Sequence, residues 1–445
     1  MDFVGKTSLS TEKVMWSTQA PFVNVDATSG DTLSIYNPHD ESQVADGIQV
    51  ASHEDVDKAV SAARAAFKGE WCQWTPQQRS DAMLKFAGRT DKHAEELALW
   101  EVKSMGQPIN VAKFVYALFG KVFRYYAGWT DKLPGEAWIE DEQGIPIGTL
   151  QLGQFVKEVG FPPGVISIIT GDGKVGAALA SHIDINKISF TGSAFAGKKV
   201  QELAAKSNLK RVTLELGSKS PSLIFPDANF VNALQHYSQN SLFNSGQACI
   251  AASRTFVHED IAEKFIQELK TRFEQFAHAM GQPMDLNTFL GLLADGKQFE
   301  RVMSFLDIGK EEVELLTGGA RYGDNGWYVH PTIFLNPKDD AGIYRGEIFG
   351  PVLTIRTFKT KEEAIKLAND TSLGLSSCIF TASIPQALRI AKHLDAGNVN
   401  INTSQVFGPN VPFGGSKQSG IGREGGRLGL MNYVEAKTIS INMNA

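Results

Sequence analysis

Cysteine and positive charge are both scarce in this 445-residue sequence. The three cysteines, Cys72, Cys249 and Cys378, are odd in number and far apart, which argues against a disulfide framework and against a Cys/His metal site. Lysine and arginine number 43 against 49 aspartates and glutamates, so the net charge of −6 leaves no basic field for nucleic-acid phosphates. We expect reduced thiols, no metal and no nucleic-acid partner, and we interpret Cys72 and Cys378 as small buried apolar residues.

Long apolar runs are absent as well. None approaches the roughly 20 residues of a membrane-spanning helix, and the first residues lack the basic and apolar regions of a secretory signal. Hydrophobic residues (42%) and charged residues (21%) occur in the proportions of a globular protein. We therefore expect a cytoplasmic protein that does not bind membranes, and the length predicts two or three domains.

Helix-like and strand-like patterns succeed one another along the chain. After short β runs in the first 50 residues, apolar residues spaced by three and four predict helices at 54–69, 79–108 and 110–131. Beyond residue 148, helical segments alternate with short β-branched runs, which is typical of parallel βαβ units. The expected strands there are 165–170, 187–192, 211–217, 253–259 and 376–381, and the expected helices are 149–160, 176–182, 196–207, 260–277, 362–371 and 384–394. We predict an α/β fold with two doubly wound lobes and a strand-like C-terminal tail.

Two glycine-containing turns offer places for phosphate groups. GDGKVG at 171–176 matches the dinucleotide pattern G-x-G-x-x-G, but no acid stands at a strand end about 20 residues later. A tight strand-to-helix turn explains this string equally well. FTGSAFAG at 190–197 predicts a second such turn, whose free N–H groups could hold a pyrophosphate or serve only the fold.

Two side chains stand out as candidates for chemistry. RVTLELGSKSP places Glu215 at the end of an apolar strand, where a carboxylate is costly to bury unless it is used, hydrogen-bonded or exposed in a loop. FNSGQACIAASR places Cys249 between a glycine-rich approach and a polar exit, where it could be a nucleophile or a small buried residue. EIFGPV (347–352) and PFGGSKQSGIGREGG (412–426) have the composition of loops.

In combination these strings resemble the aldehyde dehydrogenase superfamily. FTGS, LELGSKSP, NSGQAC, EIFGPV, NVNINT and PFGGSKQSGIGRE occur in the family's order along nearly the whole chain. The resemblance implies two Rossmann-like lobes, a small β oligomerisation element and NAD(P)-dependent oxidation of an aldehyde to a carboxylic acid. Cys249 would form a thiohemiacetal and then a thioester, and Glu215 would activate the hydrolytic water as general base.

The resemblance also implies a cofactor site and a substrate pocket. The residues matching the family's site for NAD or NADP are Gly192, Ser193, Gly197, Leu216, Glu347 and Phe349. Those matching its pocket-lining aromatics are Phe407 and Phe413. The expected substrate is a small aliphatic or aromatic aldehyde, and the expected assembly is a homo-oligomer, a dimer or a tetramer.

Five segments follow from the same resemblance. They are the N-terminal part of the coenzyme-binding domain (1–127), an oligomerisation hairpin (128–145), the truncated remainder of the coenzyme-binding domain (146–217), the catalytic domain (218–418) and a C-terminal segment with an oligomerisation strand (419–445).

The sequence also departs from the family's pattern. Between residues 144 and 149 the family carries a further block on the order of fifty residues, where a βαβ unit alone takes about 30, and only IPIG joins the flanks here. In the family this block supplies an oxyanion-hole asparagine and a ribose-binding lysine. Losing one oxyanion-hole donor typically costs about a hundred- to a thousandfold in rate. We therefore expect an incomplete coenzyme-binding sheet and weakened cofactor binding.

Smaller departures keep alternative functions open. Ser218 stands where the family usually has a second glycine, which predicts strain in a tight turn, and Gly346 stands where an acid usually precedes Glu347. One alternative is an inactive or impaired family member that acts only through oligomerisation. Another is a residual esterase without a cofactor, which needs only the thiol and water near Glu215.

Overall fold

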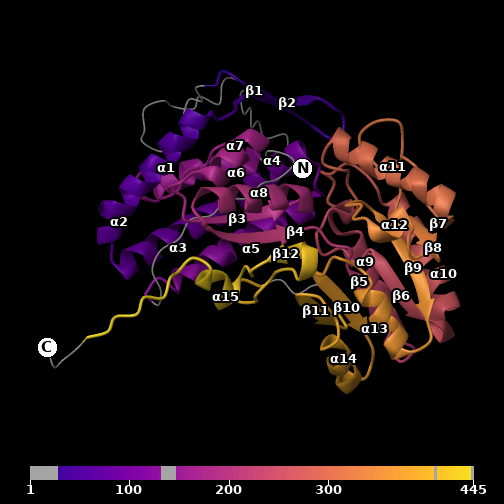
Figure 1. Cartoon of the computed structure of the whole chain (residues 1–445). Coiled ribbons are helices and arrows are strands. Elements are labelled where there is room, and N and C mark those ends of the chain that lie inside the picture. The colour runs from indigo at the N-terminus through magenta and orange to yellow at the C-terminus, as the bar shows by residue number, and fades with distance from the viewer. Residues whose placement is uncertain (1–28, 132–146, 405–407, 442–445) are drawn as a thin grey trace.

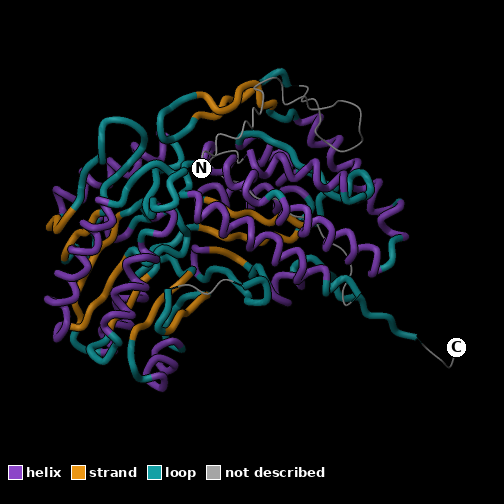
Figure 2. Tube along the Cα trace, turned by 180° about the vertical axis from the view of Figure 1, so that it is seen from behind, coloured by secondary structure: helices purple, strands orange, loops and turns teal. Residues whose placement is uncertain are grey.

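The computed structural model describes residues 29–131, 147–404 and 408–441 (Figure 1). Within these ranges the strands form a two-stranded hairpin, a three-stranded sheet and a seven-stranded sheet. Figure 2 shows the seven-stranded sheet on one side of the molecule and the smaller sheet, surrounded by helices, on the other. The expected α/β fold with two lobes is therefore confirmed.

The N-terminal part is a hairpin followed by a layer of helices. Strand β1 (Thr32–Tyr36) pairs antiparallel with β2 (Gln43–Gln49). Helix α1 (His53–Lys68) starts at a capping box in which Ser52 and Asp55 bond each other's backbone N–H groups. The further helices are α2 (Glu70–Gln73), α3 (Pro76–Lys92), α4 (Ala94–Met105), α5 (Ile109–Ala127) and α6 (Ile147–Glu158). The single helix predicted over 79–108 is thus wrong, because the chain leaves helical geometry at His93 (φ −106°, ψ 11°).

The small sheet has the order β12-β4-β3. Strands β3 (Lys187–Gly192) and β4 (Arg211–Leu216) are parallel and are joined by helix α8 (Ala194–Ser207), as the alternating pattern predicts. Strand β12 (Gly420–Ile421) pairs antiparallel with the other side of β4. Among the described residues β3 therefore has an unpaired outer edge, and β4 is the central strand.

Residues 165–170 were predicted to form a strand, and they do not. Their apolar side chains still pack, with Ile168 against the helical layer and Ile169 against the cluster under α1 and α7 (Gly173–Ser181). A β-branched run becomes a strand only where a neighbouring strand completes its hydrogen-bond ladder, and no described residue does so here. The β-branched pattern of residues 165–170 correctly indicated that their side chains pack in the interior. It wrongly indicated that their backbone pairs as a strand.

The seven-stranded sheet has the order β11-β10-β5-β6-β9-β8-β7 and is parallel except for the pair β7–β8. Its strands are β5 (Pro221–Ile224), β6 (Arg254–His258), β7 (Glu314–Thr317), β8 (Thr332–Leu335), β9 (Val352–Phe358), β10 (Ser376–Phe380) and β11 (Asn398–Ile401). Successive residues such as Phe256 and Val257 enter different core clusters, so both faces are buried.

Helices cover both faces of the large sheet. On one face lie α9 (Phe230–Ser241) and α10 (Glu259–His278). On the other lie α11 (Gly296–Glu312), α12 (Gly342–Arg345), α13 (Lys361–Asn369) and α14 (Ile384–Ala391). This arrangement is the doubly wound lobe expected from the sequence.

The chain ends beside the small sheet with α15 (Gly426–Met431) and an extended tail (Figure 1). The tail forms no strand in residues 433–441, where Ile439 and Ile441 are largely exposed. Pairing of this tail with a neighbouring subunit stays a prediction. Most of the predicted oligomerisation hairpin lies outside the described residues, and the division into five segments stays a prediction as well.

Candidate active site

Cys249 lies in the loop that leads into β6, directly after the 3-10 helix η1 (Phe243–Gly246). It is half-buried and reduced. The loop packs closely on the segment 347–350, because a Cβ on Gly246 would lie 2.1 Å from the carbonyl oxygen of Gly350. Only glycine fits at position 246, where φ is also positive. The strings NSGQAC and EIFGPV are therefore neighbours in space.

The approach to Cys249 is held in an uncommon backbone conformation. Asn244 and Ser245 both have positive φ, 50° and 58°, a geometry that costs about 1–3 kcal/mol per non-glycine residue. The side chain of Gln247 fixes this turn by donating to the carbonyl oxygens of Asn244 (3.1 Å) and Leu292 (3.0 Å). Its oxygen accepts the backbone N–H of Ala294 at 2.9 Å. Gln247 thus anchors the loop that carries the thiol.

Glu215 lies on β4, the central strand of the small sheet, and is 6% exposed. Neither carboxylate oxygen has a hydrogen-bond partner, although the Gly415 backbone N–H is close enough to favour the charged form slightly. Burial, together with the negative charge of Glu424 and against the opposing charge of Arg423, raises the pKa of Glu215 to about 9. The fold therefore presents a buried base of high proton affinity.

The charges around Cys249 show which groups gather at the site. Burial raises the pKa of the thiol to about 12, and the carboxylates of Glu347 and Glu215 contribute in the same direction. The two carboxylates are therefore close enough to act on the thiol, although the three residues come from three separate segments. At neutral pH the thiol is protonated, and it becomes a nucleophile only when its proton is removed.

The predicted phosphate-contacting residues meet at one end of the small sheet. Gly192 and Leu216 are opposite each other in the parallel register of β3 and β4. Ser193 caps α8, its hydroxyl oxygen accepting the N–H of Ala196 at 3.2 Å. Gly197 packs on Leu216, since a Cβ there would lie 2.6 Å from Leu216 Cδ2. A helix start with free N–H groups suits an anion.

Glu347 lies over the connection between β4 and β5. Its Oε1 accepts the backbone N–H of Ser218 at 2.8 Å, and a Cβ on Gly217 would lie 1.8 Å from Oε2. Burial raises the pKa of Glu347, while the Ser218 N–H, Arg301 and Lys219 each favour its ionised form. The structure thus brings this carboxylate beside the strand that carries Glu215.

Phe349 and Phe413 complete the described part of the predicted site. Phe349 has a positive φ of 60°, and Gln298 donates to its carbonyl oxygen at 2.8 Å. Phe413 is half-buried and forms an antiparallel bridge with Glu424 through N–H···O distances of 2.7 and 2.6 Å. Phe407 lies outside the described residues.

Several sequence-based interpretations need correction. Ser218 does not have a positive φ, so the predicted strain is wrong. Its hydroxyl oxygen instead accepts the Ser220 hydroxyl at 3.2 Å. Cys378 is buried as expected, whereas Cys72 is exposed on α2 because that short helix buries none of its residues.

Sequence reasoning missed four residues of the site. Glu424 stood within a string already singled out, but nothing in its spacing tied it to Glu215. Gln247 and Lys219 also stood within the strings NSGQAC and LELGSKSP, but nothing in those strings indicates an anchoring amide or a buried amine, and Gln298 belongs to neither. Among the described residues no group of acidic, histidine or cysteine side chains could hold a metal ion. None of the described helices has the length and hydropathy of a membrane span.

Known proteins resemble this chain over nearly its whole length. An aldehyde dehydrogenase of Davidiella tassiana is 39% identical and is covered to 95%, as is this chain. That alignment runs over 473 positions, more than the 445 residues present here, so the relative contains residues without a counterpart. Human retinal dehydrogenase 2 is 38% identical, with 93% of this chain and 89% of the relative covered.

The same agreement extends to three dimensions. An aldehyde dehydrogenase from Bacillus cereus, solved as an NAD+ complex, superposes with a TM-score of 0.91 at 35% identity, covering 95% of this chain and 96% of the other. The model of the aldehyde dehydrogenase family matches residues 24–146 and 140–439, two segments that overlap at 140–146, next to where IPIG joins the flanks. This chain therefore belongs to the aldehyde dehydrogenase family.

Proposed function

We propose that this chain oxidises an aldehyde to a carboxylic acid with NAD or NADP as oxidant. Family membership supports the reaction class. The observation that carries the proposal for this chain is the buried Glu215 carboxylate, whose oxygens are unpartnered and whose charge acts on the Cys249 thiol. Such a carboxylate costs stability, so its retention beside a thiol favours a chemical role.

Cys249 is the proposed nucleophile. Because burial raises the pKa of its thiol to about 12, the thiol must release its proton to solvent as Sγ attacks. Attack on the aldehyde carbonyl gives a thiohemiacetal, and loss of hydride leaves a thioester on Sγ. Glu215 accepts a proton from the water that hydrolyses the thioester and passes it to the departing sulfur, which releases the acid and regenerates the free thiol.

The residues present fit a dinucleotide, which when bound supplies the hydride acceptor. The start of α8, directly after Gly192 and Ser193, offers free N–H groups to a pyrophosphate. Glu347 uses Oε1 for the Ser218 N–H, while Oε2 makes no hydrogen bond within the described chain and suits a ribose hydroxyl. The Bacillus cereus relative was solved with NAD+, which supports NAD as one of the two nucleotides to test.

We also propose that this chain lacks a block of the coenzyme-binding domain after residue 144. The two-part family match and the alignment longer than the chain support this proposal. So do residues 165–170 and the outer edge of β3, which have no strand partner among the described residues. With the Cys249 backbone N–H as the remaining oxyanion donor, we expect turnover about a hundred- to a thousandfold below a relative with the complete block. Cofactor binding is expected to be weakened.

The unpaired edges also favour a second function, an inactive family member that acts through oligomerisation. In that case the chain forms a dimer or a tetramer without binding nucleotide. A third activity, ester hydrolysis without cofactor, would need only Cys249 and water near Glu215. We propose a cytoplasmic location in each case.

The test is nucleotide reduction by the purified chain at saturating NAD or NADP with a simple aldehyde. Cys249→Ala is the control, because it removes the nucleophile and leaves the fold. Signal present in the unmodified chain and lost in the variant supports the dehydrogenase. Absence of signal from a folded chain that binds no nucleotide overturns it in favour of the inactive family member.

A further inference from the structure

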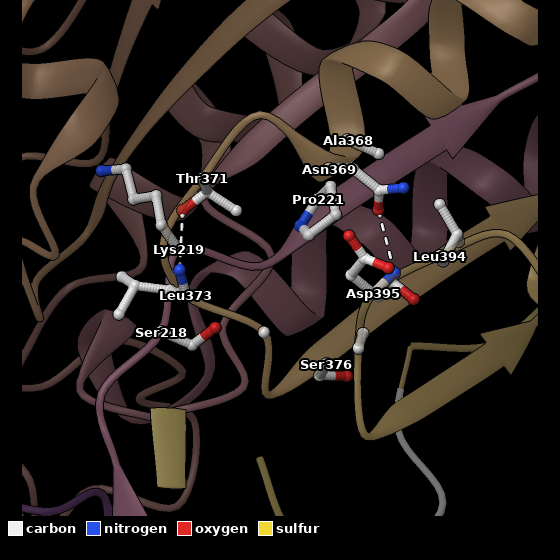
Figure 3. Close-up of a pocket in the computed structure, with 13 residues that line it drawn as sticks. Ser218, Lys219, Pro221, Ala368, Asn369, Thr371, Leu373, Ser376, Leu394 and Asp395 are labelled. Carbon is white, nitrogen blue, oxygen red and sulfur yellow. Dashed lines mark hydrogen bonds between the residues drawn. The ribbon is translucent and has the colours of Figure 1, made fainter. Parts of the chain in front are cut away.

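The cavity beside the carboxylate loop, which we define as residues 347–350, is too small for a ligand. Ser218, whose N–H bonds the Glu347 carboxylate, lines this cavity of about 10 Å³, which has room for about one water molecule. Figure 3 shows side chains such as Pro221 and Leu394 around it. Groups of the chain itself therefore hold the carboxylate loop on this side.

The segment 292–298, which leads into α11, is a fixed support close to the candidate site. The Leu293 N–H donates to the carbonyl oxygen of Trp327 at 3.0 Å. Asp295 caps α11, because its side chain accepts the N–H of Gln298 at 2.8 Å. A segment that is tied down at both ends can hold other parts of the chain in place.

The loop of the proposed nucleophile is tied to this segment by one amide. We define this nucleophile loop as residues 244–249. The Gln247 Nε2 donates to the carbonyl oxygen of Leu292 at 3.0 Å, and its Oε1 accepts the N–H of Ala294 at 2.9 Å. Two residues of the loop have positive φ, 50° and 58°, so the loop relaxes to another conformation if it is not held.

The carboxylate loop is tied to the same segment by a second amide. Gln298 is 5% exposed, and its Nε2 donates to the carbonyl oxygens of Ile348 at 3.0 Å and Phe349 at 2.8 Å. Arg301 on the same helix donates to the carbonyl oxygen before these two at 2.6 Å. Phe349 has a φ of 60°, so this loop too needs support to keep its conformation.

The two loops also touch each other directly. A Cβ on Gly246 would lie 2.1 Å from the carbonyl oxygen of Gly350, so nothing fits between them. Gly350 in turn packs on α11, where a Cβ would lie 2.7 Å from Val302 Cγ2. The glycine contact and the amides of Gln247 and Gln298 therefore all resist movement of one loop relative to the other.

We propose that Gln247 and Gln298 are positioning residues, which clamp the nucleophile loop and the carboxylate loop to the segment 292–298 and keep the two loops in one fixed relation. The inference rests on the proposed function in naming what the loops carry, the nucleophile Cys249 and the ribose-binding Glu347. Both glutamines act through backbone groups. If the clamp is opened at either glutamine, both loops lose their position.

The first test is the rate at which iodoacetamide alkylates Cys249 in Gln298→Met, without nucleotide. Methionine keeps the length of the side chain and removes both donors. In the described chain Gln298 bonds the carboxylate loop and not the nucleophile loop, so a local role would leave the thiol unchanged. The clamp predicts that the half-buried thiol reacts about five- to tenfold faster, the effect of about one lost hydrogen bond. Mass spectrometry separates Cys249 from the exposed Cys72.

Asn369→Leu is the matched control for this test. The Asn369 amide also joins two backbone groups, donating to the His393 carbonyl at 2.7 Å and accepting the Asp395 N–H at 2.9 Å, the bond drawn in Figure 3. It does so away from both loops, so Cys249 should react at the rate of the unmodified chain. An unchanged or slower thiol in a folded Gln298→Met chain would overturn the proposal.

The second test is nucleotide binding and turnover in Gln247→Met, which leaves the bonds of the carboxylate loop in place. If Gln247 served the nucleophile loop alone, kcat would fall and the nucleotide KM would stay. The clamp predicts that kcat falls and that the KM for NAD, together with the Kd from calorimetric titration, rises about five- to tenfold. A KM and a Kd equal to those of the unmodified chain would contradict the clamp.

The double variant tests whether both amides serve one clamp. Once either amide has released both loops, removing the other should add little. The losses of nucleotide affinity in Gln247→Met and Gln298→Met should therefore be less than additive when the two changes are combined. Fully additive losses would mean that each glutamine serves its own loop.

Hydrogen exchange of the unmodified chain answers the same question if a methionine variant does not fold. Loops held by one clamp open together, so peptides covering 244–249 and 347–350 should show equal protection against exchange. Unequal protection would overturn the proposal.

The alkylation test needs no nucleotide, so the two proposals can fail separately. If the unmodified chain binds no nucleotide, the dehydrogenase function fails, while a faster Cys249 thiol in Gln298→Met still supports the clamp. If the unmodified chain binds nucleotide and turns over, and the thiol of Gln298→Met reacts at the unmodified rate, only the clamp fails.

Discussion

The seven-stranded sheet and the three-stranded sheet of this chain differ in how fully they are paired and covered. The large sheet has helices on both faces and a continuous order from β11 to β7. The small sheet has one strand, β4, paired on both sides, and β3 ends it with an open edge among the described residues. The open edge of β3 lies in the region where we propose that this chain lacks a block of the coenzyme-binding domain.

The candidate site uses both regions. Cys249 lies in a loop of the larger lobe, tied down by the amide of Gln247. Glu215 comes from the small sheet, on the strand that keeps both of its neighbours. The proposed base is therefore on the strand of the small sheet that is paired on both sides. With the proposed loss of a neighbouring block, catalysis requires that β4 stays ordered.

The largest expected effect is on the rate of hydrolysis, and it tests whether Glu215 on the small sheet acts as the general base. In Glu215→Gln we expect the hydrolytic step to slow by about 10²- to 10⁴-fold, the usual contribution of a general base. Because the Glu215 pKa is about 9, the carboxylate is mostly protonated at pH 7, and hydrolysis in the unmodified chain should rise with pH up to about 9. Glu215→Gln should lose that rise.

The measurement is a burst experiment with an activated ester, which separates acylation from hydrolysis. Glu215→Gln should keep the burst of released alcohol and lose the steady state that follows. Glu101→Gln is the control, since Glu101 is also buried but lies on α4 in the helical layer. Equal loss of burst and steady state would contradict the assignment of Glu215 to hydrolysis.

The second prediction compares the stability of the two sheets directly. Phe256 is fully buried on a central strand of the large sheet, and Phe190 is 5% exposed on the open-edged β3. Phe256→Ala should cost about 3–5 kcal/mol in the free energy of unfolding, and Phe190→Ala should cost less, because a sheet with a free edge relaxes around the lost ring. Denaturant unfolding with hydrogen exchange on both lobes measures the difference. Equal costs would show that the small sheet is as tightly supported as the large one.

The sequence predicted most of this comparison, but not that residues 165–170 form no strand. The bounds of β3 were predicted correctly, because KISFTG combines β-branched residues with a turn at its end. The run 165–170 is also rich in β-branched residues and forms no strand, because pairing depends on a neighbouring strand that composition does not describe. The break between helices at His93 contains no glycine or proline, so the sequence does not predict it.

The residues of the candidate site could also be predicted only in part. Motif order led to Cys249, Glu215 and Glu347, and the structure brings these three together. Lys219 and Glu424 act through charge across the fold, on segments far apart in the chain. Such electrostatic neighbours follow from tertiary contacts alone, so no spacing within the sequence predicts them.

The third prediction concerns a buried acid in the helical layer beside the small sheet. Glu101 is 8% exposed, burial raises its pKa to about 7, and it accepts the Tyr116 hydroxyl at 3.3 Å. The unfolded chain releases this proton near pH 4.5, so stability should fall as pH rises from about 4.5 to 7 and then level off. Glu101→Gln should match the unmodified chain at pH 4 and exceed it above pH 7 by up to about 3 kcal/mol. Chemical unfolding at both pH values checks this, and an equal difference at both would refute it.

The smallest expected effect is a change of stability in the loop of the larger lobe that precedes Cys249. Ser245 has a φ of 58° and a buried hydroxyl without a hydrogen-bond partner, two costs that glycine removes. Ser245→Gly should therefore raise the free energy of unfolding by about 1 kcal/mol, despite the added entropy of the unfolded chain. Ser238→Gly is the matched control, because Ser238 is a buried serine inside α9 whose hydroxyl donates to the Gln235 carbonyl at 3.1 Å. That variant should lose about 1 kcal/mol. If both variants change the free energy of unfolding with the same sign, the backbone strain at Ser245 does not destabilise the protein. The loop that carries Cys249 is then held by Gln247 alone.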